Sequence, residues 1–375
     1  MSILQAGHQV HRGRVMVVSP ASGDRFGHDA LTREHVAREV AAALGYAFCG
    51  EHDRRESSIP VYAVPHRTLL ASEAGELRIR SEVDLLGGVV PHAFLGGKTI
   101  THAVVSPEAA VPAHWSHGLA ARLRGVVLPG YSAFSRADAR RAALAMLERG
   151  PVRLKRAGEC GGTGQYVVAD AAQVENVLAG IDDEEWLRDG MVVEQQLEEA
   201  VTYSIGSVRL GNARVAYVGT QRMVRNHHGH DVYGGSDLKV WRGGFDALAQ
   251  RPMPAPVAAA CAMAMQYDAA VSAEFPGFFA SRRNYDVVHG RDAAGAQRMG
   301  VLEQSWRIGG ATPAEIAALR AFADDARLQS VQASTHEAYG RPEPPAHAIV
   351  YFEDREQRIG GLVKYCTVDA RGYTA

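Results

Sequence analysis

The sequence has few of the features that mark secreted, membrane or nucleic-acid-binding proteins. Its four cysteines lie far apart and form no C-x-x-C pair, which argues against a disulfide framework and against a zinc site. It contains no run of about 18 apolar residues, so we expect no membrane-spanning helix and no membrane partner. A net charge of −2 gives no electrostatic reason to expect nucleic acid as a partner. We therefore expect a reduced, cytoplasmic protein.

Glycine, in contrast, is abundant: 39 residues, many of them in clusters where backbone could approach a ligand closely. A length of 375 residues favours two or three packed units. The first 115 residues alternate between apolar strands and an amphipathic helix, which predicts an open, largely parallel sheet. The predicted elements there are strands at 14–19, 60–64, 77–79 and 88–91, and a helix at 30–44.

Residues 135–180 predict a helix, a strand, a glycine loop, a second strand and a helix. Ser135 and Asp170 stand at helix starts, where their side chains can accept hydrogen bonds from free backbone N–H groups. Gly211-Asn212 joins two later strands as a hairpin. Further along we predict strands at 125–128, 191–193, 202–210, 213–218, 285–288, 300–304, 348–352 and 361–367, helices at 115–123, 254–271 and 312–328, and a polar loop at 223–239.

The glycine loop is the first candidate for a functional site. Without side chains, its backbone N–H groups can turn toward a phosphate, and Lys155 on the preceding strand adds a cation. The spacing matches neither the P-loop nor the G-x-G-x-x-G pattern, and a glycine-rich hairpin without a ligand explains the loop equally well. The loop residues in question are Gly158, Gly161, Gly162, Thr163 and Gly164.

The second candidate is Glu194-Gln195, at the end of an apolar strand and close to Leu197. Such a strand end can present backbone C=O and N–H groups to the edge of an adenine ring, with the carboxylate nearby. Acidic residues at strand ends are also common on solvated surfaces. This feature alone therefore leaves both interpretations open.

The third candidate is the pair Asp286 and Glu303, on two strands that a turn would place side by side. Two neighbouring carboxylates can hold Mg²⁺, which prefers oxygen ligands and usually bridges substrate phosphates. Arg307 follows Glu303 by four residues, and its guanidinium suits a phosphate or carboxylate. Gly309-Gly310 then lets the chain turn sharply. A surface salt bridge followed by a turn is the alternative.

The role of one group of basic residues can be interpreted in two ways. They either are ordinary loop charges or form a cationic floor for a triphosphate and an anionic substrate. These residues are Arg209, Arg222, Arg225 and Lys239.

The order of these features resembles that of the ATP-grasp superfamily, whose members clamp ATP between two α/β subdomains. The resemblance covers roughly residues 115–325 and is carried by VRLKRAGECGGTGQYVV, VVEQQLEEAVTYSIGSV and GVLEQSWRIGG. It is closest to a bacterial branch of unknown function with the phrases VLPGYSAFSRADA, VYGGSDL and LEQSWRIGG. The resemblance implies an α/β (α+β) fold with a pre-ATP-grasp domain at 1–115, a lid at 116–190 and an antiparallel-sheet subdomain at 191–375.

The resemblance also implies a role for each matching residue. Lys155 would contact the α- and β-phosphates under the glycine loop, and Glu194 through Leu197 would hold adenine, with Arg222 also at the nucleotide. Asp286, Glu303 and Ser305 would bind Mg²⁺ or Mn²⁺. Arg307, with Lys155, would act in catalysis by contacting phosphate or an acyl phosphate.

Three departures from the superfamily pattern matter. The acidic residue usual for ribose after the hinge is not plain, and Glu198, Glu199 or Thr202 could occupy its place. Ser305 stands where asparagine is usual and is a weaker metal ligand. The early lysine of the superfamily has only one candidate, Lys98 in GGKTITH.

The implied activity is ATP- and Mg-dependent ligation of a small carboxylate to an amine or thiol through an acyl phosphate. A small-molecule kinase and a non-catalytic ATP sensor are the alternatives, and a homodimer is one oligomeric state left open. Candidates for facing the acceptor are His92, His102, Arg225, Tyr233 and Lys239.

Overall fold

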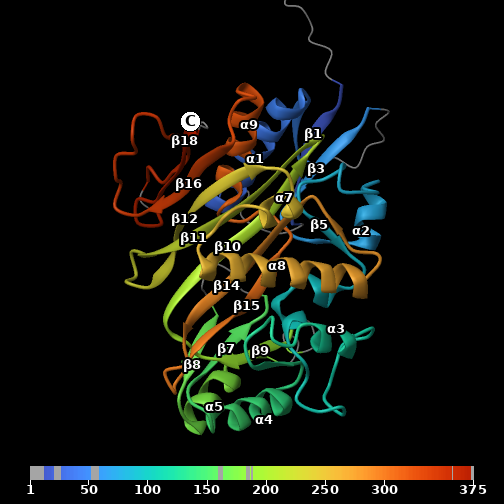
Figure 1. The fold of residues 1–375 in the computed structure, drawn as a ribbon, viewed down its shortest axis with the longest axis vertical. Coiled ribbons are helices and arrows are strands. Elements are labelled where there is room, and N and C mark those ends of the chain that lie inside the picture. Colours follow the sequence, from blue (N-terminus) through green and yellow to red (C-terminus); the bar gives the residue numbers. More distant parts are fainter. Residues whose placement is uncertain are drawn as a thin grey trace, which may run out of the picture.

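A computed structural model describes residues 12–20, 27–51, 59–158, 164–182, 186, 189–356 and 358–372. Within them the chain forms two three-stranded sheets, one four-stranded sheet and one eight-stranded sheet. In Figure 1 the eight-stranded sheet crosses the middle of the molecule, with the four-stranded sheet and its helices below and the N-terminal strands at the upper right.

The N-terminal unit is built on a parallel sheet of order β2-β1-β3, as the β/α alternation predicts. Helix α1 packs on it through Val36 and Val40, one helical turn apart, against Val15 and Val64. The helix ends at Gly45, whose φ of 67° is the left-handed conformation that glycine adopts most readily. The bounds are β1 Arg14–Val18, α1 His28–Leu44, β2 Ala47–Glu51 and β3 Val61–Pro65.

A second small sheet joins strands from the N-terminal and C-terminal halves of the chain. Strands β4 and β5 are parallel, and β13, from the C-terminal half, pairs antiparallel with β5. The prediction of a strand at 77–79 is wrong: these residues follow α2 as a turn. The segment 125–128 forms a single parallel bridge from Val127 to Val301. The elements are β4 Leu69–Leu70, α2 Ala71–Glu76, β5 Gly88–Val90, the 3-10 helices η1 Ala93–Gly96 and η2 Lys98–Thr101, α3 His117–Arg122 and β13 Phe279–Ala280.

The four-stranded sheet, of order β6-β9-β7-β8, is antiparallel. Helices α4 and α5 start at their predicted caps, where Ser135 accepts from the N–H of Asp138 and Asp170 from that of Gln173. Both helices cover one face of the sheet through an apolar core that includes Leu154. The bounds are β6 Gly130–Ala133, α4 Arg136–Leu147, β7 Val152–Arg156, β8 Gln165–Val168, α5 Ala171–Ala179 and β9 Met191–Gln195.

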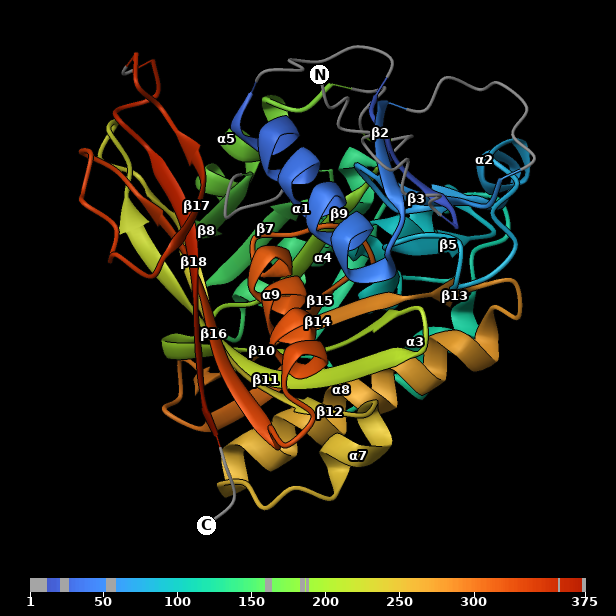
Figure 2. The same cartoon turned by 90° about the horizontal axis from the view of Figure 1, so that it is seen from above.

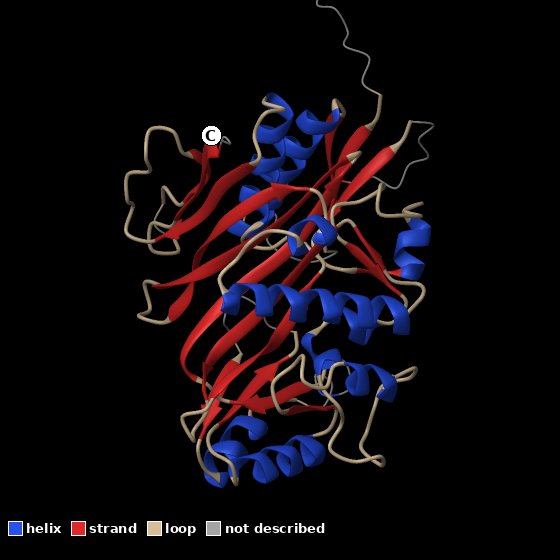
Figure 3. Cartoon of the chain, in the orientation of Figure 1, coloured by secondary structure: helices blue, strands red, loops and turns tan. Residues whose placement is uncertain are grey.

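The eight-stranded sheet, of order β15-β14-β10-β11-β12-β16-β18-β17, is the structural centre. Figure 2 shows α7 and α8 on one face of this sheet and α9 and α1 on the other. Figure 3 shows that a separate pair of helices, α4 and α5, covers the four-stranded sheet. The bounds are β10 Glu198–Leu210, β11 Ala213–Arg225, β12 Asp231–Arg242, α7 Phe245–Ala249, α8 Ala255–Glu274, β14 Arg282–Arg291, β15 Gln297–Ser305, α9 Thr312–Asp324, β16 Ser330–Ala338, β17 Ile349–Glu353 and β18 Val363–Gly372.

The predicted loop at 223–239 is wrong, because β11 and β12 run through it with a short turn between them. Two of its glycines, Gly234 and Gly235, lie on β12 where neighbouring atoms leave no room for a side chain. A Cβ on Gly235 would lie 2.0 Å from the carbonyl oxygen of Thr335 on β16, a strand that the sequence pattern did not reveal. A glycine-rich, polar segment can therefore be a central strand where neighbouring backbones approach closely.

No helix in the described part of the chain is long and apolar enough to cross a membrane. The division into three domains remains a prediction. Strand β9 completes the four-stranded sheet, so that sheet extends past the predicted boundary at residue 190.

Candidate functional site

Lys155 connects the four-stranded sheet to the eight-stranded one. Because side chains alternate along a strand, Lys155 points away from the α4/α5 face that buries Leu154. Its Nζ lies 2.9 Å from Glu194 Oε1 and donates to the carbonyl of Leu302 on β15 at 3.1 Å. Lys155 is 2% exposed and Glu194 1%. A buried cation is thus placed at the junction of the two sheets.

His102 completes a buried group of three with Lys155 and Glu194. Its Nε2 lies 3.5 Å from Glu194 Oε2. Burial lowers the pKa of His102, with Glu194 opposing this effect, so the imidazole is neutral at neutral pH. Burial alone would raise the pKa of Glu194, but Lys155 and His102 together hold it below its usual value. Because both carboxylate oxygens are engaged, Glu194 orients Lys155 rather than standing free for adenine.

The segment just after Glu194 has unused hydrogen-bonding capacity beside an apolar surface. Gln195 Oε1 is buried without a hydrogen-bond partner among the described residues. Leu197 packs with Leu128 and Val288, and Leu302 lies against this cluster. A buried polar atom beside apolar side chains suits the edge and faces of a purine ring.

Lys98, from a distant part of the chain, contacts the same strand, β15. It lies in η2, which packs against β6, β9 and β15. Its Nζ is 3.0 Å from Glu303 Oε2, and the Glu303 side chain is 26% exposed. Two buried lysines from distant parts of the chain therefore meet β15 at consecutive residues, Leu302 and Glu303.

Asp286 and Glu303 are cross-strand neighbours on β14 and β15, as the sequence predicts. Ser204 donates to Asp286 Oδ1 at 2.9 Å. Burial and the nearby Glu303 raise the pKa of Asp286 to about 6, although hydrogen bonds from Gln221 and Ser204 oppose the rise. Two carboxylates that repel each other in this way fit a divalent cation.

The ligand set fits magnesium better than zinc. Among the described residues, no three His, Cys, Asp or Glu side chains cluster as a complete metal site. Mg²⁺ commonly uses one or two carboxylates and completes its shell with water and substrate phosphate oxygens. Asp286 and Glu303 match that pattern.

Ser305 and Arg307 continue from Glu303 toward α9. Ser305 lies opposite Asn284 in the register of β14 and β15, two residues beyond the Asp286–Glu303 pair. The guanidinium of Arg307 donates to the carbonyl of Ile308 at 2.8 Å. The next turn is closed by Thr312, whose hydroxyl accepts from the N–H of Gly309 at 3.0 Å. The chain thus reverses sharply just after the candidate metal ligands.

The glycine loop is described only at its two ends. Gly158 follows β7, and Gly164 precedes β8 with a φ of 64°. Gly161, Gly162 and Thr163 lie outside the described residues. The loop therefore starts three residues after Lys155, just beyond the end of β7, the strand that carries this buried cation.

The four basic residues do not form a common floor beneath this group. Arg222 pairs with Asp237 and donates to the carbonyl of Thr335, and is not part of the site that we propose. The others pair separately: Arg209 with Glu82, Arg225 with Asp231, and Lys239 with the ring of Trp241.

The acceptor candidates are also dispersed. His92 stacks on His114 with ring centroids 4.5 Å apart. The hydroxyl of Tyr233 contacts Ser236 at 2.7 Å, and its ring lies where a side chain on Gly310 would be. Tyr233 thereby lies near the turn that follows Arg307, whereas His102 lies beside Glu194.

Sequence reasoning missed the partners that hold this site together. Ser204, Gln221 and His102 were not recognised in their observed roles. A serine or glutamine on a strand carries no local signal of its neighbour across the sheet, since that neighbour is set by register.

Comparison with known proteins places the chain in a family and identifies its fold. It matches a family described as "Protein of unknown function (DUF3182)" over residues 16–366. No curated protein matches it.

Similar solved structures include N5-carboxyaminoimidazole synthetase from Staphylococcus aureus complexed with ADP, at 11% identity and a TM-score of 0.56, covering 97% of this chain and 95% of that one. Biotin carboxylase from Campylobacter jejuni, complexed with β,γ-ATP, is 10% identical with a TM-score of 0.53, over 95% and 87%. Both are ATP-grasp proteins. At such identities the likeness establishes the fold alone. The chain has the ATP-grasp fold and belongs to the DUF3182 family.

Proposed function

We propose that this protein is an ATP- and Mg²⁺-dependent ligase that joins a small carboxylate to an amine or a thiol through an acyl phosphate. One observation carries the proposal: Lys98 and Lys155, both buried, converge on Leu302 and Glu303 of β15. Cations held at that point, beside the Asp286–Glu303 pair, suit the phosphates of a nucleotide. Two solved nucleotide complexes of similar fold add support, since those proteins bind ADP or β,γ-ATP.

Each residue then has a defined task. Lys98 and Lys155 would exchange their carboxylate partners for phosphate oxygens when the nucleotide binds. The backbone from Gln195 to Leu197 would hold the adenine edge. The glycine loop after Lys155 would cover the phosphates and exclude water. These residues act by positioning and by charge stabilisation, which suffices for phosphoryl transfer without a side-chain nucleophile.

Asp286 and Glu303 would hold Mg²⁺, which neutralises charge on the transferred phosphoryl group. Arg307 would steady the phosphate or the acyl phosphate, because guanidinium presents a planar fork to such anions. Ser305, a weaker ligand, would contribute at most one neutral oxygen.

The test is to incubate the protein with Mg·ATP and pooled carboxylates, amines and thiols, following ADP release and new product masses. We expect ADP together with an amide or thioester, and neither with Glu303→Gln. A phosphoester product would identify a kinase instead. Tight ATP binding without ADP release from any pool would identify a sensor and refute the ligase proposal.

A further inference from the structure

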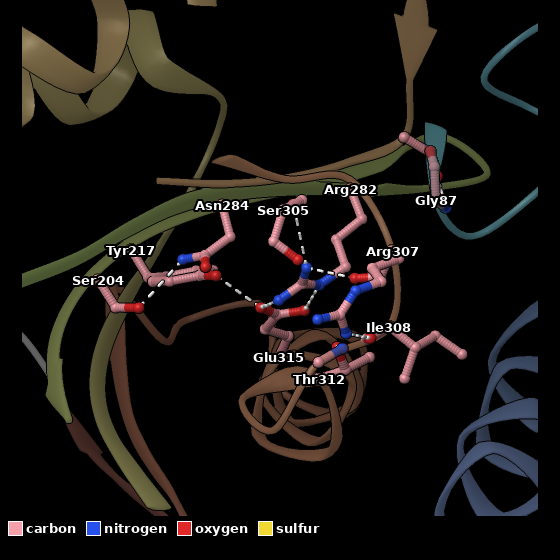
Figure 4. A network of polar contacts seen from close by, with 12 residues as sticks. Gly87, Ser204, Tyr217, Arg282, Asn284, Ser305, Arg307, Ile308, Thr312 and Glu315 are labelled. Carbon is pink, nitrogen blue, oxygen red and sulfur yellow. Dashed lines mark hydrogen bonds and ion pairs between the residues drawn. The ribbon is translucent and has the colours of Figure 1, made fainter. Parts of the chain in front are cut away.

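Arg282 and Glu315 form a buried ion pair between the eight-stranded sheet and α9. Arg282 begins β14, and its Nε and Nη2 donate to the two carboxylate oxygens of Glu315 at 2.7 and 2.8 Å. Arg282 is 1% exposed and Glu315 0%. Figure 4 shows the guanidinium and the carboxylate facing each other beside the helix. This is the two-bond geometry in which Arg–carboxylate pairs are strongest.

The third nitrogen of the guanidinium binds the backbone at the end of β15 and just after it. Nη1 of Arg282 donates to the carbonyl of Ser305 at 3.3 Å and to the carbonyl of Arg307. Figure 4 shows both contacts converging on one nitrogen. The backbone on either side of Trp306 is thereby fixed to β14. The two residues so fixed are Ser305, a candidate metal ligand, and Arg307, the residue proposed to contact phosphate.

The partners of this pair keep its charges in place. The Tyr217 hydroxyl donates to Glu315 Oε1 at 2.6 Å, and burial raises the pKa of Tyr217 well above its usual value, so the phenol remains a donor. Removing two charges from water is costly, and a buried pair is therefore weak evidence for stability alone. Such a pair is better explained where it fixes one particular arrangement of neighbouring groups.

We propose that Arg282 is a positioning residue for the reaction, acting through the backbone of Ser305 and Arg307. Glu315, in the first turns of α9, holds the guanidinium in the orientation that this requires. The pair sets the direction of the Arg307 side chain and keeps Ser305 beside Glu303. This inference rests on the proposed function, because it assigns the phosphate and metal end of the same nucleotide site.

The adjacent residue offers a matched control. Arg283 makes a comparable pair, with Nη1 at 2.8 Å from both carboxylate oxygens of Asp268 on α8. Successive side chains on a strand point to opposite faces, so this pair lies on the other side of the sheet from Glu315. A lysine at either position retains the charge but loses the planar fork.

The test compares Arg282→Lys, Glu315→Gln and Arg283→Lys by isothermal titration calorimetry. Metal-free ADP, titrated in EDTA, reports on the adenine and lysine contacts. The Mn²⁺ complex of an ATP analogue with a β,γ-imido bridge reports in addition on the metal and the γ-phosphate. We expect Arg282→Lys and Glu315→Gln to weaken the Mn²⁺ complex about tenfold or more and ADP by less than about threefold. Arg283→Lys should change neither constant by more than about threefold.

Two results would overturn the proposal. One is that Arg282→Lys and Glu315→Gln leave both affinities unchanged or reduce both equally. The other is that both variants lose cooperative unfolding while Arg283→Lys stays folded, which would assign the pair to stability alone. Failure of the unaltered protein to bind either ligand is a separate result that refutes the nucleotide site itself, and this inference with it.

Discussion

Replacing Asp286 by asparagine should stabilise the metal-free protein, although it removes a residue of the candidate metal site. Asp286 and Glu303 are neighbours across two strands, and burial together with Glu303 raises the pKa of Asp286 from its ordinary 3.8 to about 6. A carboxyl group with a raised pKa opposes folding at neutral pH, where it must be ionised. Asparagine keeps the shape and can still accept the hydrogen bond from Ser204.

The size of the effect follows from the pKa. Each pH unit corresponds to about 1.36 kcal/mol, so a change from 3.8 to about 6 gives an upper value of about 3 kcal/mol. Asp286 is partly exposed, and solvent screening reduces this to about 1–2 kcal/mol. Unfolding entropy of about 2.1 cal/mol/K per residue gives about 0.8 kcal/mol/K for 375 residues. We therefore expect the Tm to rise by about 1–3 °C.

Scanning calorimetry in EDTA at two pH values tests this reasoning. The pKa is higher in the folded state, so the penalty grows as pH rises from about 4 to about 6 and is constant above. The advantage of Asp286→Asn should therefore be about half as large at pH 5 as at pH 8. Saturating Mg·ATP should reverse the order, because a ligand stabilises the form that binds it better. A lower Tm for the metal-free variant, or the same difference at both pH values, would refute the argument.

Three further predictions concern the lysines and the metal. Lys155→Met leaves Glu194 buried without its cation, so the free energy of unfolding in urea should fall by about 3 kcal/mol or more. Adding Glu194→Gln to this variant should restore most of the lost stability. An unchanged free energy of unfolding in Lys155→Met would contradict the stabilising role of the ion pair. Lys98→Met should weaken ATP binding about tenfold in calorimetry, because it removes the cation beside Glu303, and unaltered affinity would exclude Lys98 from the site. Mn²⁺ affinity, followed by electron paramagnetic resonance, should rise between about pH 5 and pH 7 as Asp286 loses its proton, and a flat profile would contradict the raised pKa.

The elements that the sequence predicted well carry their signals locally. Helices α4 and α5 begin where Ser135 and Asp170 accept backbone hydrogen bonds, and β8 lies between a glycine loop and the second cap. The segment 223–239 was misjudged because its glycines serve the close approach of another strand. Gly235 shows this, since a side chain there would collide with the backbone of the distant Thr335 and with the side chain of Arg222, and its φ of 134° is one that other residues rarely adopt.

The sequence could indicate several residues of the candidate site, but it could not indicate most of the contacts that these residues make. The sequence indicated Lys155 by its place before the glycine loop, and Asp286 and Glu303 by two strands that a turn would pair. The contact of Lys98 with Glu303 depends on how η2 packs against β15, which no local pattern contains. Arg282 lies before the strand predicted at 285–288, and Glu315 lies in the first turn of a predicted helix, so neither belongs to a recognised site motif. Only the assembled fold shows that both are buried and paired.

The central claim is that Mg·ATP binds where Lys98, Lys155, Asp286 and Glu303 meet. Calorimetric titration of the protein with ATP, in Mg²⁺ and again in EDTA, tests it most directly. We predict saturable binding of one ATP per chain, weakened about tenfold or more both by EDTA and by Glu303→Gln, and unaffected by Arg283→Lys. Absence of binding, or equal affinity in Mg²⁺, in EDTA and in the Glu303 variant, would contradict the account.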